Sequence, residues 1–342
     1  MKKHLLTALS IALVFGWSCQ SDDLQEVVNS EENKLALDGA TLHGGAGALK
    51  NCASHAVLER QLQENPLLAK KLEAIEAQAR VFEEAQRSTN GKISGQAAAT
   101  NSIINIPVIV HVIYSTSQQN ISDAQIQSQI NVLNADFSAQ NSEIGAGLVP
   151  TEFASRVANS EISFSLAQVT RTYSSRTEWG TRDDMKYTSK GGHDVIQPSK
   201  YLNIWVCNIG GGILGYAQFP GGNAATDGVV VGPQYFGDTG WVVAPFNKGR
   251  TTTHEIGHWL NLRHIWGDGR CNQDDFVSDT PTADRANYGC PKYPTVHCRT
   301  NDMTMNYMDY TDDACMYMFS NGQKTRMRAL FASGGARQGF AL

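Results

Sequence analysis

The sequence predicts an α/β (α+β) fold, with a twisted mixed sheet and helices, a loop-rich C-terminal part and a preceding helical segment. Three observations support this prediction. Runs of β-branched residues alternate with helical patterns after residue 103, as in sheets covered by helices. A long irregular stretch follows them, and residues 56–87 carry leucines at helical spacing. The 342 residues, 41% of them hydrophobic, suffice for about two domains.

Residues 1–18 predict an export signal, which takes no part in the fold. A short basic start precedes an apolar stretch at 5–15. Ser18 before Cys19 resembles the bacterial lipobox, in which the cysteine is lipidated, although Gly16 replaces the usual leucine. The alternatives are a lipoprotein of the bacterial outer membrane or cell surface, and a secreted protein that is cut nearby. Both lie in an oxidising compartment that permits disulfides.

The chain divides into parts of different composition. Residues 19–55 are polar and glycine-rich, which predicts a tether that contains Cys52. Residues 56–102 predict helices followed by a linker, and Pro66 should split the helical pattern or start a new helix. Residues 103–342 then form the main domain.

Each element of the main domain is predicted from its local pattern. Residues 104–114 form a β-branched run that is typical of a buried strand. Ser122 should cap a helix over 123–138, with Gln125 in the capping-box position. Further strands are predicted at 161–171, 202–209 and 229–231, and further helices at 253–262 and 322–331.

The composition excludes two classes of function. Lys and Arg number 28 against 33 Asp and Glu, which gives a net charge of −5 and argues against nucleic-acid binding. No apolar stretch approaches the ~20 residues that a membrane-spanning helix needs. We expect a monomer that meets a membrane only through lipid on Cys19.

The predicted helix at 253–262 carries a metal-binding pattern. His254 and His258 lie one helical turn apart, so both imidazoles can reach one Zn²⁺. Glu255 lies one position further around the helix, where it can hold the attacking water without being a ligand. This is the arrangement of the general base in a zinc protease.

A third histidine tests this interpretation. His264 lies six residues after His258, about 240° around a continued helix, so the helix must end before it. A left-handed residue near position 261 would turn the chain back, and Asn tolerates that conformation best after Gly. Asn261 occupies this position. The sequence therefore predicts one zinc held by three histidines, with an open fourth position.

The motif HExxHxxNxxH at 254–264 resembles the zinc motif of the metzincins, with Asn261 in place of the usual glycine. NYMDY at 306–310 resembles the methionine turn of those proteins. Together with the cysteines and acidic residues between them, these motifs make residues 103–332 similar to the pappalysin family. The resemblance implies a metzincin catalytic domain with an active-site helix and a loop-rich C-terminal subdomain, preceded by a pro-segment. Such a protein hydrolyses peptide bonds.

The resemblance also implies a role for each matched residue. The three histidines would bind zinc, and Glu255 would act first as base and then as acid. Met308 would form an apolar floor under the metal. Tyr310 would lean on the metal or on the tetrahedral intermediate.

Substrate-binding residues follow from the same resemblance. Asp313 would lie at the base of the primed-side pocket, and the neighbouring Asp312 is the alternative acid for this position. A carboxylate there would pair with Arg or Lys, so we expect cleavage on the N-terminal side of Arg or Lys. Gly215 and Tyr216 lie in a strand that would rim the cleft and pair with the substrate backbone.

The chain has seven cysteines. Four lie in the loop-rich part, and the sequence alone permits three pairings of them. The resemblance points to Cys271–Cys298 and Cys290–Cys315. Cys207 lies in an apolar strand, which predicts a buried free thiol.

Cys52 lies outside the predicted catalytic domain. It resembles the cysteine switch of pappalysin zymogens, in which a thiolate occupies the fourth zinc position and excludes water. The alternatives are an incidental cysteine and a Cys52–Cys207 pair. In the loop-rich part, Asp275, Ser278 and Thr280 supply hard oxygens at the place where family members bind structural Ca²⁺.

The first hypothesis is therefore a zinc endopeptidase that is made as a latent zymogen. The alternative is a non-catalytic surface lipoprotein that binds a protein or glycan partner through a degenerate metal site. A third is a zinc hydrolase of another substrate class. The intact Glu255 favours an enzyme, because a binding protein does not need it, and the rim strand and methionine turn favour peptide as the substrate.

Overall fold

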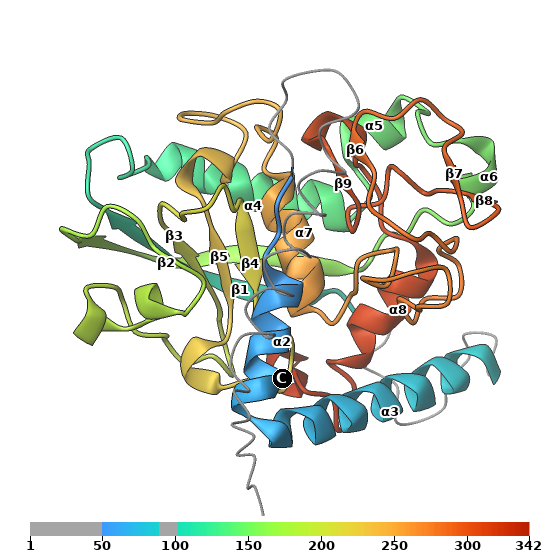
Figure 1. Cartoon of the computed structure of the whole chain (residues 1–342), viewed down its shortest axis with the longest axis horizontal. Helices are drawn as coiled ribbons and strands as arrows, with labels where there is room; N and C mark the ends of the chain where they lie inside the picture. The colour runs from blue at the N-terminus through green and yellow to red at the C-terminus, as the bar shows by residue number, and fades with distance from the viewer. Residues whose placement is uncertain (1–49, 89–101, 342) are drawn as a thin grey trace, which may run out of the picture. The chain divides into compact units, whose positions relative to one another are not determined.

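The computed structural model describes residues 50–88 and 102–341, which belong to one compact unit (Figure 1). The predicted export signal at 1–18, the predicted lipid acceptor Cys19 and nearly all of the predicted linker lie outside the described residues. Within the described ranges, no helix is long and apolar enough to cross a membrane.

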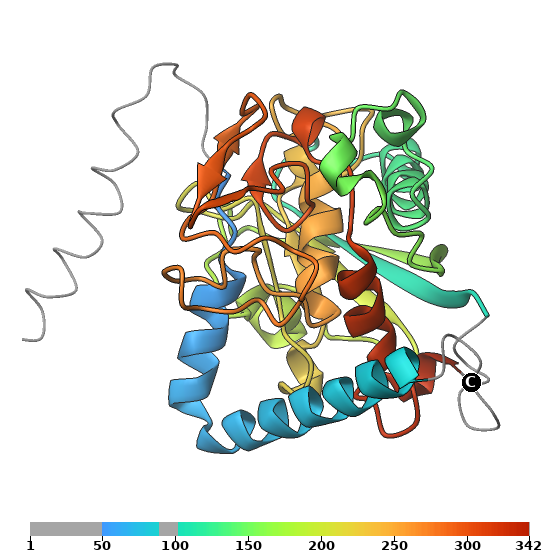
Figure 2. The same ribbon diagram turned by 90° about the vertical axis from the view of Figure 1, so that its right-hand side faces the viewer.

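Within the described residues, two helices precede the sheet. Helix α2 spans Ser54–Glu64 and helix α3 spans Pro66–Ser88. Proline is favoured at the first helical position, where its missing N–H costs nothing, so the predicted split at Pro66 is confirmed. Figure 2 shows the two helices meeting at one end and running in different directions. Helix α2 packs on β4 and helix α3 packs on α8.

A mixed sheet of five strands is the centre of the fold. Its order is β2-β1-β3-β5-β4, and all neighbours are parallel except β4 and β5. The strands span Ile104–Tyr114 (β1), Ile162–Tyr173 (β2), Leu202–Val206 (β3), Gly215–Ala217 (β4) and Val229–Val231 (β5). The sheet agrees with the predicted one, although β3 ends at Val206 rather than at residue 209.

The longer helices of the main part are α4 (Asp123–Phe137), α7 (Arg250–Trp259) and α8 (Asn321–Ala329), and α5 (Ser142–Gly145) and α6 (Thr151–Ala154) are single turns. Short 3₁₀ helices are η2 (Asp184–Lys186), η3 (Thr188–Lys190), η4 (Ala224–Thr226), η5 (Pro233–Tyr235), η6 (Asp313–Cys315) and η7 (Gln338–Ala341). Two-residue strands of the C-terminal part are β6 (Tyr288–Gly289), β7 (Val296–His297), β8 (Thr300–Asn301) and β9 (Tyr310–Thr311). The loop-rich C-terminal subdomain is therefore present.

The start of α4 corrects one local prediction. The Ser122 hydroxyl accepts from the backbone N–H of Gln125 at 3.1 Å, as an N-cap should. The return bond of a capping box is absent from this turn. The Gln125 amide instead donates to the carbonyls of Pro233 and Phe236 at 2.9 Å, which ties α4 to the loop after β5. Tertiary contacts thus override the local pattern.

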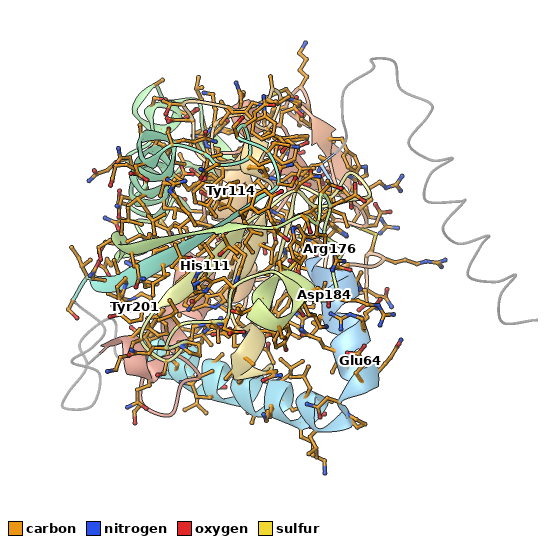
Figure 3. All side chains as sticks on the ribbon, turned by 90° about the vertical axis from the view of Figure 1, so that its left-hand side faces the viewer. Glu64, His111, Tyr114, Arg176, Asp184 and Tyr201 are labelled. Atoms are coloured by element: carbon orange, nitrogen blue, oxygen red, sulfur yellow. A yellow bond between two sulfur atoms is a disulfide. The ribbon has the colours of Figure 1, made fainter. Side chains whose placement is uncertain are left out.

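The two faces of the sheet carry different cores. On one face, side chains of β1, β3 and β5 pack with Ile126 of α4, Trp259 of α7 and Met327 of α8. On the other face, Trp205 and Tyr216 pack together with neighbouring apolar residues. His111 of β1 stacks on Trp205, with ring centroids 5.1 Å apart, and is labelled in Figure 3. Each face is thus buried, and α7 is fixed against the first of them.

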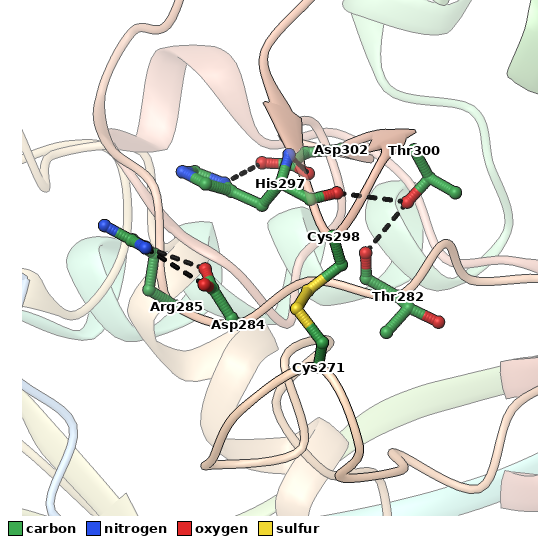
Figure 4. The surroundings of a disulfide bond; sticks show 8 residues. All are labelled: Cys271, Thr282, Asp284, Arg285, His297, Cys298, Thr300 and Asp302. Atoms are coloured by element: carbon green, nitrogen blue, oxygen red, sulfur yellow. Dashed lines mark hydrogen bonds and ion pairs between the residues drawn. A yellow bond between two sulfur atoms is a disulfide. The ribbon is translucent and has the colours of Figure 1, made fainter.

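Two disulfides hold the loop-rich part together. They join Cys271 to Cys298 and Cys290 to Cys315, which confirms the pairing that the resemblance implied. Figure 4 shows that the Thr300 hydroxyl, close to the first bridge, bonds the carbonyl of Thr282. Cys52 and Cys207 are both buried free thiols, so the alternative of a Cys52–Cys207 pair is wrong.

Candidate metal centre

Helix α7 ends early enough to bring three histidines together. It stops at Trp259, three residues before the predicted end, and Leu260 is its C-cap. Asn261 follows with φ of +70°, and the N–H of Leu262 bonds the carbonyl of Gly257 at 2.9 Å. The predicted left-handed turn at Asn261 is confirmed, and the chain after it runs back toward the helix.

The three imidazoles converge through their Nε2 atoms. The Nε2 atom of His258 lies 3.1 Å from the Nε2 atoms of both His254 and His264. The Nδ1 atoms face outward, toward the carbonyl of Tyr307 at 2.7 Å for His254 and that of Leu262 at 2.8 Å for His258. A carbonyl only accepts, so each of these Nδ1 atoms carries the proton and each Nε2 presents a lone pair.

Burial supports the neutral form of these rings. The side chains of His254 and His258 are fully buried, and desolvation lowers the pKa of both imidazoles well below the usual value. Metal binding requires the neutral imidazole. The residues present therefore fit a metal ion of the zinc type, with three nitrogen ligands and room for a fourth.

Glu255 lies in the same buried space. Its Oε2 atom accepts from the Ser54 hydroxyl at 2.7 Å and from the Cys52 thiol at 3.3 Å, whereas Oε1 has no partner. Burial raises the pKa of Glu255 to about 7. A Cβ atom added at Gly215 would lie 2.9 Å from the Val230 carbonyl oxygen and 3.0 Å from Cγ of Glu255. Gly215 is thus required for the close approach of β4 to the glutamate.

Met308 lies beneath α7, as its predicted role requires. It is fully buried, and a Cβ atom added at Gly257 would lie 2.4 Å from its sulfur. The glycine between Glu255 and His258 therefore makes room for Met308, a function that sequence reasoning did not assign to it. Tyr310 is also close, with its ring centroid 4.9 Å from that of His264.

We expect Gly257→Ala to lower the free energy of unfolding by about 1–3 kcal/mol, the usual cost of overpacking a core. A loss of stability would be informative, because helix propensity alone would make the alanine variant more stable than the glycine protein by about 1 kcal/mol. Gly145→Ala is the matched control, since an added Cβ meets nothing within 4 Å there. Denaturant unfolding measures both variants. Equal stability of Gly257→Ala and the unchanged chain would contradict the proposed packing of Met308.

A segment from the N-terminal side reaches the metal centre. The Cys52 thiol and the three histidines present ligand atoms that all lie within 4.8 Å of one another. The segment runs parallel to β4: the N–H of Leu214 bonds the carbonyl of Asn51 at 3.0 Å, and the N–H of Ala53 bonds that of Gly215 at 3.1 Å. It therefore pairs with the edge of the sheet through one parallel bridge between Cys52 and Gly215.

Two residues close to Cys52 in the sequence also reach this buried space. Ser54 binds Glu255 on one side of Cys52. Lys50, on the other side, is 3% exposed and its Nζ lies 3.1 Å from the Met316 sulfur. Sequence reasoning missed both residues, because their partners depend on how this segment pairs with β4.

The environment of Lys50 includes the predicted pocket acid. Burial lowers the pKa of the Lys50 ammonium, and Asp313 is the strongest of the charges that oppose this shift. Asp313 is fully buried, and its Oδ2 accepts from the backbone N–H groups of Lys248 at 2.9 Å and Arg250 at 3.2 Å. Its Oδ1 has no partner. Asp312 is more exposed, so Asp313 is the buried acid of the two.

The remaining predicted residues lie as follows. Tyr216 pairs with Val230 of β5, and its hydroxyl bonds the Asp183 carboxylate at 3.0 Å, so a substrate-binding role for Tyr216 stays a prediction. Thr280 donates to Asp275 at 2.6 Å, and burial raises the pKa of Asp275 to about 7. Ser278 accepts from Arg87 at 3.5 Å. Calcium binding at these three oxygen-bearing residues stays a prediction.

Comparison with known proteins identifies close relatives. The family described as pregnancy-associated plasma protein-A (Peptidase_M43) matches residues 187–332. An extracellular metalloprotease of Pyricularia oryzae is 33% identical over 272 residues, which cover 76% of this chain and 85% of that protein. Extracellular metalloprotease 1 of Coccidioides posadasii is 32% identical over 265 residues, which cover 73% of this chain and 85% of that protein.

Two solved structures are similar over nearly their full length. Mature mirolysin of Tannerella forsythia, in complex with a cleaved peptide, is 46% identical with a TM-score of 0.69 and covers 71% of this chain and 97% of its own. A promirolysin mutant of the same organism is 40% identical with a TM-score of 0.76 and covers 85% of this chain and 97% of its own. Promirolysin thus matches a larger share of this chain than mature mirolysin does.

Proposed function

Because the chain belongs to the pappalysin family of metalloproteases, we propose that it is a zinc-dependent endopeptidase, made as a latent zymogen, that cleaves proteins before Arg and Lys. The observation that carries the proposal is the convergence of three imidazole Nε2 atoms beside a buried glutamate. His254, His258 and His264 would hold the ion. A surface protein that only binds a partner would not need Glu255.

The reaction follows from the placement of Glu255. Bound Zn²⁺ would supply Lewis acidity toward the water and the scissile carbonyl. The free Oε1 of Glu255 accepts the proton that the water loses as its oxygen attacks the carbonyl carbon. As the C–N bond breaks, Glu255 returns that proton to the leaving amine. The phenol of Tyr310 donates to the Cys52 carbonyl at 3.2 Å, so it is placed to donate to a substrate carbonyl instead.

Substrate recognition combines backbone and side-chain contacts. The edge of β4 binds an extended segment through the carbonyl of Gly215 and the N–H of Leu214, and a peptide can use the same groups. The buried Oδ1 of Asp313, which has no hydrogen-bond partner, favours a basic side chain. The favourable charge interaction of the buried Lys50 with Asp313 supports this assignment, because it places a lysine side chain near this carboxylate.

A peptide-library digest tests the proposed activity. The purified chain is incubated until its N-terminal segment has been cut off, and the products are then sequenced with and without a zinc chelator. We expect cleavage before Arg and Lys, abolished by the chelator and restored by added Zn²⁺. Cleavage before other residues would refute the Asp313 pocket. No cleavage by a folded, zinc-loaded chain would instead support the non-catalytic alternative.

Latency is proposed to depend on Cys52. Residues 50–88 would form the described part of a pro-segment, and 103–342 the catalytic domain. The Cys52 thiol would occupy the fourth metal position, and Ser54 and Cys52 together cover Oε2 of Glu255. The higher coverage of this chain by promirolysin supports this division. A cut between the end of α3 and β1 would release the pro-segment.

We expect Cys52→Ala to speed self-processing of the full-length chain at least about tenfold, the factor that corresponds to about 1.4 kcal/mol of lost docking energy. The other contacts of the pro-segment remain, so the variant should still fold as a zymogen. Cys207→Ala removes the other buried free thiol and is the control. Gel analysis over time gives both rates. Equal rates for the two variants would contradict the proposed switch.

The location of the protein is proposed from its relatives. Those named here are extracellular metalloproteases, so we propose that this chain is secreted. Lipid on Cys19, a bound Ca²⁺ and a monomeric state stay predictions. Mass spectrometry of the exported protein would determine whether Cys19 is the modified N-terminus.

A further inference from the structure

One of the three histidines differs from the other two in the hydrogen-bond partner of its Nδ1 atom. The Nδ1 atoms of His254 and His258 bond backbone carbonyls, which are neutral. The Nδ1 atom of His264 instead bonds Oδ1 of Asp268, four residues along the chain. His264 is thus the single ligand, of the three, that is held by an anionic side chain.

The backbone of the loop after His264 turns so that the Asp268 carboxylate reaches the His264 ring. The N–H of Gly267 bonds the carbonyl of His264 at 2.9 Å, and Gly267 and Asp268 both adopt left-handed backbone with φ of +60° and +57°. That conformation is costly for a residue with a Cβ, although aspartate tolerates it better than most. Strain of this kind is commonly kept at functional sites.

The same loop fixes the plane of the His264 ring. The indole of Trp266 stacks on the imidazole, with centroids 4.3 Å apart and planes only 5° apart. Stacking holds the tilt of the ring but permits rotation within its plane. The Asp268 bond to Nδ1 removes that freedom, so Nε2 points at the place where the other two Nε2 atoms meet.

We propose that Asp268 is the positioning residue of the metal centre: through Nδ1 it orients His264 and adds negative charge behind the ligand. This inference rests on the proposed zinc site. A carboxylate behind a ligating imidazole raises the basicity of the ligand and fixes its tautomer. Asp268 never contacts substrate in this role, because its effect passes through His264.

A second contact of Asp268 offers a competing explanation. Its Oδ2 lies 3.5 Å from Nδ1 of His55 in α2, so the carboxylate also meets the pro-segment. If this were its purpose, removal of His55 would have the same effect as removal of the charge. The experiment therefore includes both changes.

The test measures zinc affinity rather than peptide cleavage. All variants are made in full-length chains that carry Glu255→Gln, so that the pro-segment stays attached. Zinc dissociation constants are obtained by chelator competition, and the visible absorption of the Co²⁺-loaded chains reports ligand geometry. Asp268→Asn keeps the size and the left-handed backbone but loses the charge, and Asp268→Gly removes the side chain without backbone strain.

We expect zinc binding about tenfold weaker for Asp268→Asn and up to about 100-fold weaker for Asp268→Gly, with an altered Co²⁺ spectrum. Asp284→Asn, which removes a charge that pairs with Arg285, should change neither. Unfolding midpoints of the metal-free chains are measured as well, so that a change in fold stability is separated from a change in zinc affinity.

Three results would overturn the inference. An unchanged zinc constant in both Asp268 variants would leave the carboxylate with a structural role only. An equal loss of affinity in His55→Ala would assign the effect to the pro-segment contact. Failure of the Glu255→Gln chain to bind Zn²⁺ would overturn this inference together with the proposed function. Zinc binding by that chain, with no peptide cleavage by the chain that keeps Glu255, would refute only the proposed function.

Discussion

Replacement of Glu255 by Gln is expected to lower kcat/KM for peptide hydrolysis about 10²–10⁴-fold, the usual contribution of a general base. Glutamine has the size of glutamate, and in the full-length chain it can keep the bond from the Ser54 hydroxyl, which Oε2 accepts at 2.7 Å. It cannot take a proton from water at neutral pH. The loss should therefore appear in kcat, with zinc content and unfolding midpoint unchanged.

The measurement needs chain from which the pro-segment has been removed, because the variant will not process itself. Mature protease from the unchanged chain, added in trace amounts and then separated, can supply the cut. Glu152→Gln is the control, since Glu152 is an exposed acid that bonds Asn301. If Glu255→Gln retained full activity with one zinc bound, another residue would have to be the base.

Asp313→Asn is expected to remove the preference for basic residues. The amide oxygen can still accept from the N–H groups of Lys248 and Arg250, so the start of α7 keeps its support. In the native residue Oδ1 has no hydrogen-bond partner. In the variant an uncharged amide nitrogen takes the place of Oδ1, so the side chain no longer carries a negative charge. Loss of one member of a buried charged pair costs about 2–5 kcal/mol, which is roughly 30-fold or more in kcat/KM for Arg and Lys substrates.

Matched peptides that differ only in Lys or norleucine after the scissile bond give this ratio directly. Norleucine has the apolar stem of lysine without the ammonium. Asp312→Asn is the control, because Asp312 adjoins Asp313 but is less buried. Should Asp312→Asn change the Lys-to-norleucine ratio and Asp313→Asn leave it intact, the pocket would be assigned to the wrong acid.

Local patterns predicted the elements of the fold well. Strand β1 has the predicted bounds, since its β-branched run ends where the polar loop begins. Helix α7 was predicted to span 253–262 but spans Arg250–Trp259. The histidine pattern cannot mark where a helix starts, and the left-handed Asn261 ends it earlier than its apolar neighbours suggest. The missing return bond of Gln125 likewise depends on a loop more than 100 residues away.

The sequence could predict those site residues that lie close to one another along the chain. His254, Glu255 and His258 share one helix, and their spacing alone gives their relative positions. Lys50 and Ser54 could not be assigned in this way, because their partners depend on the pairing of the segment with β4. Asp268 was missed for another reason: its bond to His264 requires two successive left-handed residues, which no periodic pattern predicts.

The pairing of Asn51 and Ala53 with β4 also has a consequence for biosynthesis. An edge strand with free N–H and C=O groups is a template for aggregation, and this edge is occupied while residues 50–88 remain attached. Leu58, Leu68 and Leu72 also pack on Phe219, an apolar side chain that would lose these contacts. A chain synthesised from β1 onward would fold with both surfaces bare. We therefore expect a lower yield of soluble protein from this shortened chain than from the full chain, even when both disulfides have formed.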